Sequence, residues 1–249
     1  MIDYIILGLV QGITEFLPVS SSAHLLLAQN ILGLRGEEIA LSIVLHLGTL
    51  LAISLFFYQD ILKCLRDKKT LFFICLVTLI TGLIGLAGKD FFEQLFSRQG
   101  YLAASLIVTG IILLFTRFSL RGKREQANIK DGLILGIAQG VAIVPGISRS
   151  GLTISTLLFR GLNVNKSFSL SFIVSLPAIL GAVILEARKI DFSLRANFTY
   201  LAAGFICSFI SGMLALYGLK RIIQKAKFYY FGYYCLLLGL TVYFLTNFK

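Results

Sequence analysis

Six long apolar runs without a charged residue follow one another along this chain, and they constrain its fold more than any other feature. A helix needs about 17–25 mostly apolar residues to cross a bilayer, and each run reaches that length. Hydrophobic residues make up 57% of the chain and charged residues 14%, which is more apolar surface than a soluble domain could bury. The sequence therefore predicts an all-α polytopic membrane protein with six transmembrane helices. The runs are Ile39–Gln59, Thr70–Gly88, Gln99–Thr116, Ser167–Leu185, Ala196–Leu219 and Phe228–Phe248.

Two further apolar stretches do not fit a single crossing. Tyr4–Leu34 has 31 residues, and Glu15, Pro18 and three serines interrupt it. Gly132–Phe159 has 28 residues and is interrupted at Pro145. Each stretch is too long for one helix and too short for two full spans. Both fit a re-entrant pair of half-helices, because non-helical backbone at membrane depth is tolerated where protein or a wet cavity surrounds it. The alternative is a single kinked span in each case.

Basic residues favour the re-entrant interpretation. Cytoplasmic loops of membrane proteins carry an excess of lysine and arginine. Loops 60–69, 117–131 and 220–227 each hold four or five basic residues, whereas 89–98 and 188–195 hold fewer and include acidic ones. All three basic loops lie in the cytoplasm only if Gly132–Phe159 enters and leaves the membrane on the same side. The net charge of +11 therefore indicates membrane orientation and no nucleic-acid partner.

An internal repeat supports the same topology. The hexapeptide LGLVQG at Leu7–Gly12 returns as LGIAQG at Leu135–Gly140, an offset of 128 residues, and a proline and a serine-rich turn follow each copy. Three full spans lie between the copies, so the second copy is inverted in the membrane. Inverted repeats with broken helices are typical of transporters, and the breaks mark the binding site. We expect one membrane domain, 1–249, with repeats at about 1–117 and 129–249.

The first break carries a set of polar side chains with a shared direction. Gln11 and Glu15 are four residues apart and lie on one helix face. Pro18 ends this helix, and the serines 20, 21 and 22 are strong N-cap residues for the next one. Ser21 and His24 then share a face of the second half-helix. The free N–H groups and positive dipole at its start would favour an anion.

The second break contributes a cation. Ser148 and Ser150 can cap a half-helix, and Arg149 lies at its mouth, with a planar fork that suits phosphate oxygens. Glu15 and Arg149 are the only charged residues deep within the two broken stretches, and a purely structural ion pair is the alternative. A carboxylate, a hydroxyl, an imidazole and a phosphate clamp together favour phosphoryl transfer.

The two motifs carry a resemblance that covers the whole chain. QGITEFLPVSSSAHL at Gln11–Leu25 and PGISRSG at Pro145–Gly151 resemble the paired signatures of the bacterial undecaprenyl-diphosphate phosphatase family, the bacitracin-resistance type. The resemblance implies hydrolysis of undecaprenyl diphosphate to undecaprenyl phosphate and inorganic phosphate, which recycles the carrier for cell-wall peptidoglycan. It also implies a multi-pass protein of the bacterial plasma membrane, a site that faces outside, and a divalent cation, Mg²⁺ or Ca²⁺.

The resemblance carries over residue by residue. The family's Glu/Gln-x-x-x-Glu element falls on Gln11 and Glu15, and its serine and histidine fall on Ser21 and His24. Many members have glutamate at the position of Gln11. Because this chain has only one carboxylate in the element, Glu15 is the expected metal ligand. The predicted catalytic residues are Glu15, Ser21, His24 and Arg149, and the predicted substrate-binding residues are Gln11, Ser20, Ser22, Ser148 and Ser150.

Two alternatives stay open at this point. Ser21 is either the nucleophile or a group that positions the attacking water. The inverted repeat alone would also fit a polyprenyl-phosphate flippase or transporter, which needs a substrate site but no base beside a nucleophile. A homodimer is compatible with the sequence, which does not determine the oligomeric state.

Overall fold

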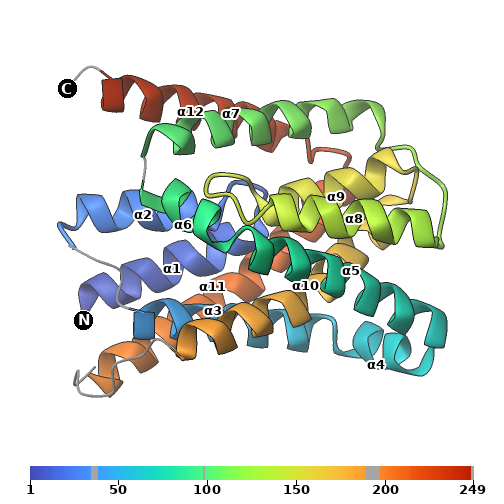
Figure 1. Cartoon of the computed structure of the whole chain (residues 1–249), viewed down its shortest axis with the longest axis horizontal. Helices are drawn as coiled ribbons and strands as arrows, with labels where there is room; N and C mark the ends of the chain where they lie inside the picture. Colours follow the sequence, from blue (N-terminus) through green and yellow to red (C-terminus); the bar gives the residue numbers. More distant parts are fainter. Residues whose placement is uncertain (35–38, 98, 189–196, 248–249) are drawn as a thin grey trace.

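The chain forms a bundle of α-helices whose polar breaks meet in its interior (Figure 1). The structure is a computed structural model, and it describes residues 1–34, 39–97, 99–188 and 197–247. Within those ranges all the secondary-structure elements are helices, apart from one isolated β-bridge that joins Arg124 to Leu162. The helices are α1 (Ile2–Phe16), α2 (Ser21–Ile31), α3 (Ile39–Phe56), α4 (Tyr58–Arg66), α5 (Lys68–Ala87), α6 (Lys89–Ser97), α7 (Gln99–Phe115), the 3₁₀ turn η1 (Thr116–Phe118), α8 (Ile129–Val141), α9 (Arg149–Phe159), α10 (Val164–Ala187), α11 (Phe198–Gln224) and α12 (Tyr230–Asn247).

Five of the predicted spans appear as helices long and apolar enough to cross a membrane. They are α3, α5, α10, α11 and the run Tyr101–Phe118, which combines α7 with its 3₁₀ extension. The last predicted span corresponds to α12, whose apolar run Tyr230–Thr246 is a shorter helix. The chain is therefore a multi-pass membrane protein.

Three of the segments predicted as loops are mostly helical, so that part of the prediction is wrong. Most of 60–69 belongs to α4, nearly all of 89–98 belongs to α6, and 220–224 belong to α11. In α4 the buried Cys64 faces inward while charged residues lie at both ends, with Asp60 in the first turn and Arg66 in the last, as the helix dipole favours. Short amphipathic helices of this kind escape a search for apolar runs. The predicted loop 188–195 lies outside the described residues except for Arg188.

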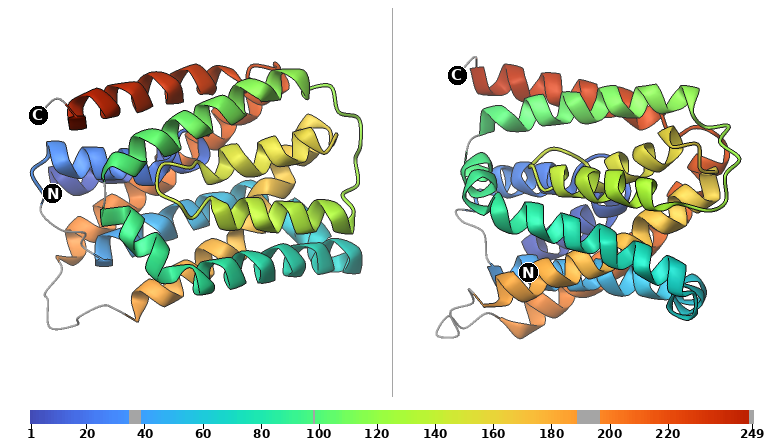
Figure 2. Two further views of the ribbon diagram at one scale, coloured as in Figure 1. Left: turned by 45° about the horizontal axis from the view of Figure 1, so that its top comes forward. Right: turned by 45° about the vertical axis from the view of Figure 1, so that its right-hand side comes forward.

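Helices that are distant in sequence pack as pairs. α7 and α12 lie side by side along one edge of the bundle, α1 packs mainly against α11, and α8 packs mainly against α5 (Figures 1 and 2). Gly8 allows one close approach, because a Cβ atom there would lie 2.5 Å from the carbonyl oxygen of Gly204 on α11. A Cβ atom at Gly12 would overlap Ser211 and the carbonyl of Ser208. Small residues thus let the helix that carries Glu15 sit directly on α11.

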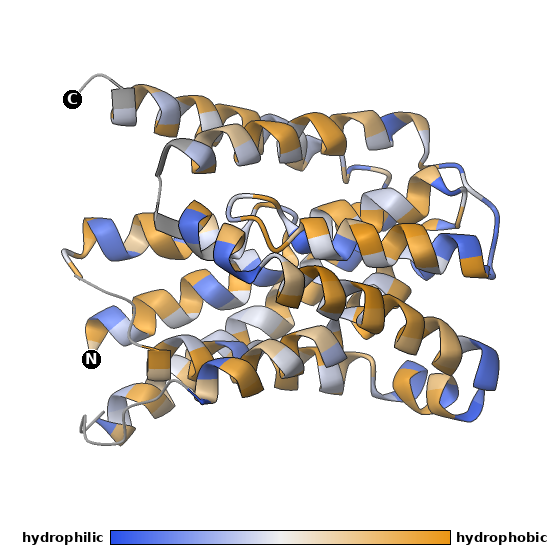
Figure 3. Cartoon of the chain, in the orientation of Figure 1, coloured by the Kyte–Doolittle hydropathy of each residue, from blue (hydrophilic) through white to orange (hydrophobic). Residues whose placement is uncertain are grey.

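One end of the bundle is hydrophilic. α4, the segment 119–128 and the turn between α9 and α10 lie there, while Met1 and the end of α12 lie at the opposite end (Figures 1 and 3). A buried carboxylate ties this end together: Asp131 Oδ2 accepts from Arg124 Nη2 at 2.6 Å, and Oδ1 accepts from Arg160 Nε at 2.7 Å. Because Asp131 is in the first turn of α8 and Arg160 follows α9, both ends of this helix pair are held at one place.

Asp131 lies outside the membrane-spanning helices, and its environment favours the charged form. Burial raises the pKa of this carboxyl, but hydrogen bonds from Arg124, the Asn128 N–H and Arg160 outweigh it, so the net pKa is lowered. Asn128 and Asp131 also form a reciprocal capping box at the start of α8. We call the contacts of Asp131 with Arg124 and Arg160 the lock, and it depends on an ionised Asp131.

Candidate active site

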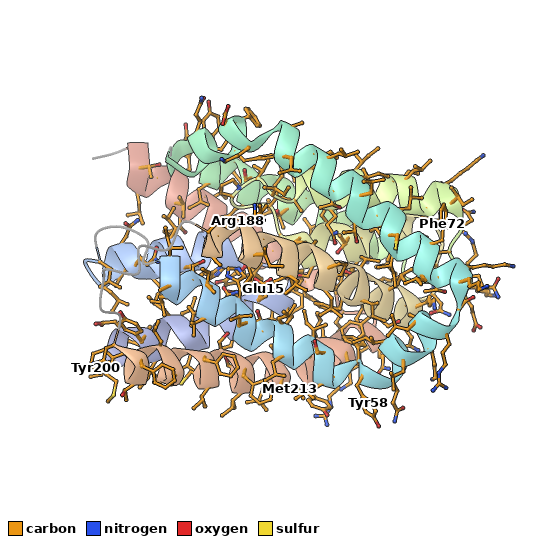
Figure 4. The ribbon with its side chains drawn as sticks, turned by 60° about the horizontal axis from the view of Figure 1, so that its bottom comes forward. Glu15, Tyr58, Phe72, Arg188, Tyr200 and Met213 are labelled. Carbon is orange, nitrogen blue, oxygen red and sulfur yellow. The ribbon has the colours of Figure 1, made fainter. Side chains whose placement is uncertain are left out.

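Glu15 is the hub of the polar interior. Its carboxylate Oε2 accepts hydrogen bonds from Gln11 Nε2 at 3.2 Å and from Ser21 Oγ at 2.6 Å. Its Oε1 pairs with Arg149 Nη2, and only 2% of the Glu15 side chain is exposed. Figure 4 places Glu15 within the bundle, away from the edges at which Tyr58 and Tyr200 lie. A buried carboxylate is stable as an anion only when it is paired and hydrogen-bonded, and this one is both.

The first break arises from a proline and a strained serine. Pro18 disfavours helical backbone at the preceding residue, and Leu17 is extended, with φ −65° and ψ 143°. Ser20 then takes a positive φ of 70°, a conformation that costs a residue other than glycine about 1–3 kcal/mol. Its hydroxyl caps α2 by accepting from the Ala23 N–H at 3.4 Å. This turn brings Ser21, at the start of α2, back to Glu15, near the end of α1.

The second break is built around Gly146 and Ser148. Gly146 has a φ of 91°, and a Cβ atom there would lie 2.7 Å from the Cβ of Ser105 on α7, so the position requires glycine. The Ser148 hydroxyl caps α9 by accepting from the Gly151 N–H at 3.1 Å. Thr109 of α7 holds the turn from outside, because its hydroxyl accepts from the Ser148 N–H at 3.2 Å. Arg149 is therefore the first residue of a capped helix.

Three direct side-chain or backbone contacts join the two breaks. Arg149 pairs with Glu15, the Ser150 hydroxyl donates to the Leu17 carbonyl at 3.3 Å, and the Gly146 N–H donates to the Ser22 hydroxyl at 3.4 Å. The motifs stand more than a hundred residues apart in sequence, so only the fold brings them together. Residues from both breaks thus form one composite site.

His24 lies beside this cluster but faces another way. Its Nδ1 is 2.8 Å from the Ser20 carbonyl oxygen, and its Nε2 is 2.7 Å from the Tyr234 hydroxyl of α12. In the described part of the chain no hydrogen bond joins His24 to Glu15, Ser21 or Arg149. His24 lines an apolar groove of about 570 Å³ formed by residues of α1, α2, α11 and α12 and of the adjoining turns.

Comparison with known proteins identifies the family of this chain. A sequence model of the family described as "Bacitracin resistance protein BacA" matches residues 4–241. The chain belongs to this family. Over 247 residues it is 41% identical to an undecaprenyl-diphosphatase of Carboxydothermus hydrogenoformans, covering 96% of this chain and 94% of that protein. It is 40% identical over 243 residues to an undecaprenyl-diphosphatase of Thermotoga petrophila, covering 96% and 98%. The protein of the same name from Methanobrevibacter smithii is 37% identical over 268 residues, covering 98% and 96%.

The predicted site residues of this BacA family member fall into two groups. Most of them are brought together around the Glu15–Arg149 pair, in contact with it or in the adjoining turns: Gln11, Glu15, Ser20, Ser21, Ser22, Ser148, Arg149 and Ser150. His24 is the exception, since it is adjacent in sequence but directed into the groove. Their catalytic and binding roles stay predictions.

The oxygen ligands near Glu15 fit a divalent cation only in part. Gln11 lies one helical turn before Glu15, and its Oε1 is buried without a hydrogen-bond partner. Carboxylate and amide oxygens are ligands that Mg²⁺ and Ca²⁺ accept. In the described ranges no three His, Cys, Asp or Glu side chains converge at one place. The protein could therefore supply two ligands to a cation, and the others would have to come from phosphate oxygens and water.

Sequence reasoning missed the hydroxyl-lined side of the site. A small cavity lined by Glu15 and Arg149 is also lined by Thr153 of α9 and Ser171 of α10, whose hydroxyls lie 2.5 Å apart. It also missed Tyr234, the partner of His24. In an apolar membrane protein, hydroxyl groups are common helix-packing residues, so no sequence signal distinguishes these from the others.

Proposed function

We propose that this chain is an undecaprenyl-diphosphatase, which hydrolyses undecaprenyl diphosphate to undecaprenyl phosphate and inorganic phosphate. The observation that carries this proposal is the hydrogen bond of 2.6 Å between the Ser21 hydroxyl and a buried carboxylate that also pairs with an arginine. The name shared by the relatives supports it. The product would re-enter cell-wall synthesis, and removal of the diphosphate would account for the family's link with bacitracin resistance.

Arg149 and the start of α9 provide the phosphate-binding part of the site. The guanidinium has five N–H donors and uses Nη2 for Glu15, so other donors can meet phosphate oxygens. The N-terminus of α9, capped by Ser148, adds free backbone N–H groups and a positive dipole. Ser150 lies beside it in the same turn. These groups would neutralise the charge that develops on the transferred phosphoryl group.

Glu15 and Ser21 provide the reacting pair. A nucleophile within hydrogen-bond reach of a base, itself oriented by a third group, is the arrangement of covalent catalysis. In one route the Ser21 oxygen attacks the terminal phosphorus, its proton passes to Glu15, and undecaprenyl phosphate leaves. Water then hydrolyses the phosphoserine. In the other route Ser21 positions a water that attacks directly while Glu15 takes its proton. A trapped phosphoserine would distinguish the first route from the second.

A divalent cation, Mg²⁺ or Ca²⁺, belongs to the proposal as a cofactor. Glu15 and the unpartnered Gln11 Oε1 would hold it, and when bound it would reduce the negative charge of the diphosphate. Glutamine in place of a second carboxylate makes the protein's own contribution weak, so affinity would depend on the substrate oxygens.

For the membrane arrangement we propose six transmembrane helices and two re-entrant pairs, α1–α2 and α8–α9, related as inverted repeats. The contact between Asp131 and Arg160 supports the second pair, because it holds the start of α8 and the end of α9 at one end. The packing of α1 on α11 and of α8 on α5 relates equivalent helices of the two repeats. The basic end would face the cytoplasm of the plasma membrane, and the active site would open to the outside.

A polyprenyl-phosphate flippase is the rival function, and detergent separates the two. Vectorial transport needs a sealed membrane, whereas hydrolysis does not. The purified chain in detergent micelles should release inorganic phosphate from a prenyl diphosphate, and Glu15→Gln should not. Absence of release by the wild-type chain, with intact folding and added Mg²⁺, would contradict the phosphatase. All the site residues come from one chain, so monomers in the micelle should suffice.

A further inference from the structure

The contacts of His24 determine its tautomer. The Ser20 carbonyl oxygen, 2.8 Å from Nδ1, can only accept a hydrogen bond, so Nδ1 carries the proton. In the neutral imidazole Nε2 is then an acceptor, and the Tyr234 hydroxyl at 2.7 Å donates to it. The two rings also lie nearly parallel, with centroids 5.7 Å apart and an angle of 11° between planes. Tyr234 therefore engages the one ring nitrogen of His24 that could take a proton.

Tyr234 reaches this position because α12 is docked on the first break. The neighbouring Cys235 is fully buried, and its thiol donates to the Pro18 carbonyl at 3.4 Å. Ala23 of α2 packs with Val242 of α12 and with residues of α7 in one apolar cluster. This docking places the phenol hydroxyl of Tyr234 beside the imidazole of His24.

The groove shows what this imidazole faces. Its walls are mainly apolar and include Ile13, Leu17 and Phe231. The titratable groups that line it with His24 are Lys227, Tyr230 and Tyr234, all from α12 or the turn before it. Glu15 and Arg149 line a separate cavity, which shares no lining residue with the groove. An apolar groove with an imidazole in its wall suits a ligand with a hydrocarbon chain and a polar head.

We propose that Tyr234 is a positioning residue, which acts on the reaction through His24. Its hydroxyl holds the neutral imidazole with Nδ1 protonated and fixes Nε2 at the wall of the groove, along which the head of the lipid would pass. Without that hydroxyl the ring keeps its bond to Ser20 but loses the donor that defines the direction of Nε2. The inference rests on the proposed phosphatase activity only for its kinetic consequence.

Imidazole ¹⁵N NMR tests the first part without any substrate. The chain has two histidines, so His46→Gln leaves His24 as the only imidazole signal. We expect a protonated Nδ1 and an unprotonated, hydrogen-bonded Nε2. Tyr234→Phe should move the Nε2 resonance toward that of a free unprotonated nitrogen. The matched control is Tyr233→Phe, on the neighbouring exposed position of α12, which should leave both resonances in place.

Kinetics test the second part. With a prenyl diphosphate in detergent, Tyr234→Phe should lower kcat roughly tenfold, the rate equivalent of one net hydrogen bond, with KM changed less than about twofold. Tyr233→Phe should change neither constant. An unchanged Nε2 resonance, or full kcat in Tyr234→Phe, would overturn the inference. If the wild-type chain releases no phosphate, the phosphatase proposal fails, while the NMR result still decides whether Tyr234 orients His24.

Discussion

Removal of both partners of the Glu15–Arg149 pair should harm catalysis little more than removal of one. The carboxylate accepts from two neutral donors, Gln11 and Ser21, and from one charged donor, Arg149. Arg149→Ala leaves a carboxylate that is only 2% exposed without its counter-charge. Glu15→Gln leaves the guanidinium paired with an amide and takes the base away from Ser21. Each single change therefore disables the same arrangement.

The expected magnitudes follow from these contacts. Loss of one group that stabilises developing charge costs about 10²–10³ in kcat, or about 2.7–4 kcal/mol. If Glu15 and Arg149 acted independently, the double variant would lose about 10⁴–10⁶. Because they act as a unit, the double variant should resemble the poorer single variant, which corresponds to a coupling free energy of about 3 kcal/mol. Arg149→Ala should also raise KM, since the guanidinium can meet the diphosphate before reaction.

The assay is phosphate release from a prenyl diphosphate by the four matched proteins in detergent. Thermal unfolding of each protein is needed, because breaking a buried ion pair can cost about 3–5 kcal/mol of stability. His46→Ala is the control: it lies in α3, bonds to the Ser42 carbonyl, and should keep most activity. A double variant whose loss equals the product of the single losses would refute the composite site.

Three further predictions concern the topology, the cation and the lock at the hydrophilic end. In a chain without its native cysteines, Lys123→Cys and Lys225→Cys should label only from the cytoplasm and Lys89→Cys only from outside; outside labelling at 225 would contradict the re-entrant α8–α9 pair. A chelator should suppress phosphate release and added Mg²⁺ or Ca²⁺ should restore it, whereas full activity in excess chelator would exclude a required cation. Because the folded-state pKa of Asp131 is lowered, its stabilisation is complete above its ordinary pKa near 4 and is lost as pH falls through the folded value. Unfolding midpoints measured below about pH 4 should therefore fall more steeply in the wild type than in Asp131→Asn, and parallel curves would contradict the lock.

The sequence predicts the helical class and most spans well, because in a bilayer the apolar length of a segment nearly determines its structure. The starts of α2 and α9 were also predictable, since Ser20 and Ser148 are N-cap residues and both cap as expected. The helices α4 and α6 were not predictable in this way. They are short and amphipathic, and their stability comes from packing on neighbours.

The composite site was predictable as a set of residues but not as a geometry. Glu15 and Arg149 stand out because charge in an apolar stretch is costly. Helix periodicity places Ser21 and His24 on one face of α2, yet Ser21 meets Glu15 while His24 turns to Tyr234. The difference depends on the positive φ of Ser20 and on the docking of α12. Neither can be read from local spacing, because both are consequences of tertiary packing.

The two sequence copies keep their packing and differ in their chemistry, and this difference favours catalysis over transport. Gln11 and Gln139 are equivalent, both are fully buried, and each leaves its amide oxygen without a partner. At the 128-residue offset of these glutamines, however, Glu15 corresponds to Ile143, and at the 127-residue offset of Pro18 and Pro145, Arg149 corresponds to Ser22. Two carboxylates brought together would repel, whereas one carboxylate from the first copy and one guanidinium from the second attract. A carrier that alternates between equivalent inward and outward states gains nothing from this asymmetry, while a hydrolase needs a base on one side of the phosphate and a cation on the other.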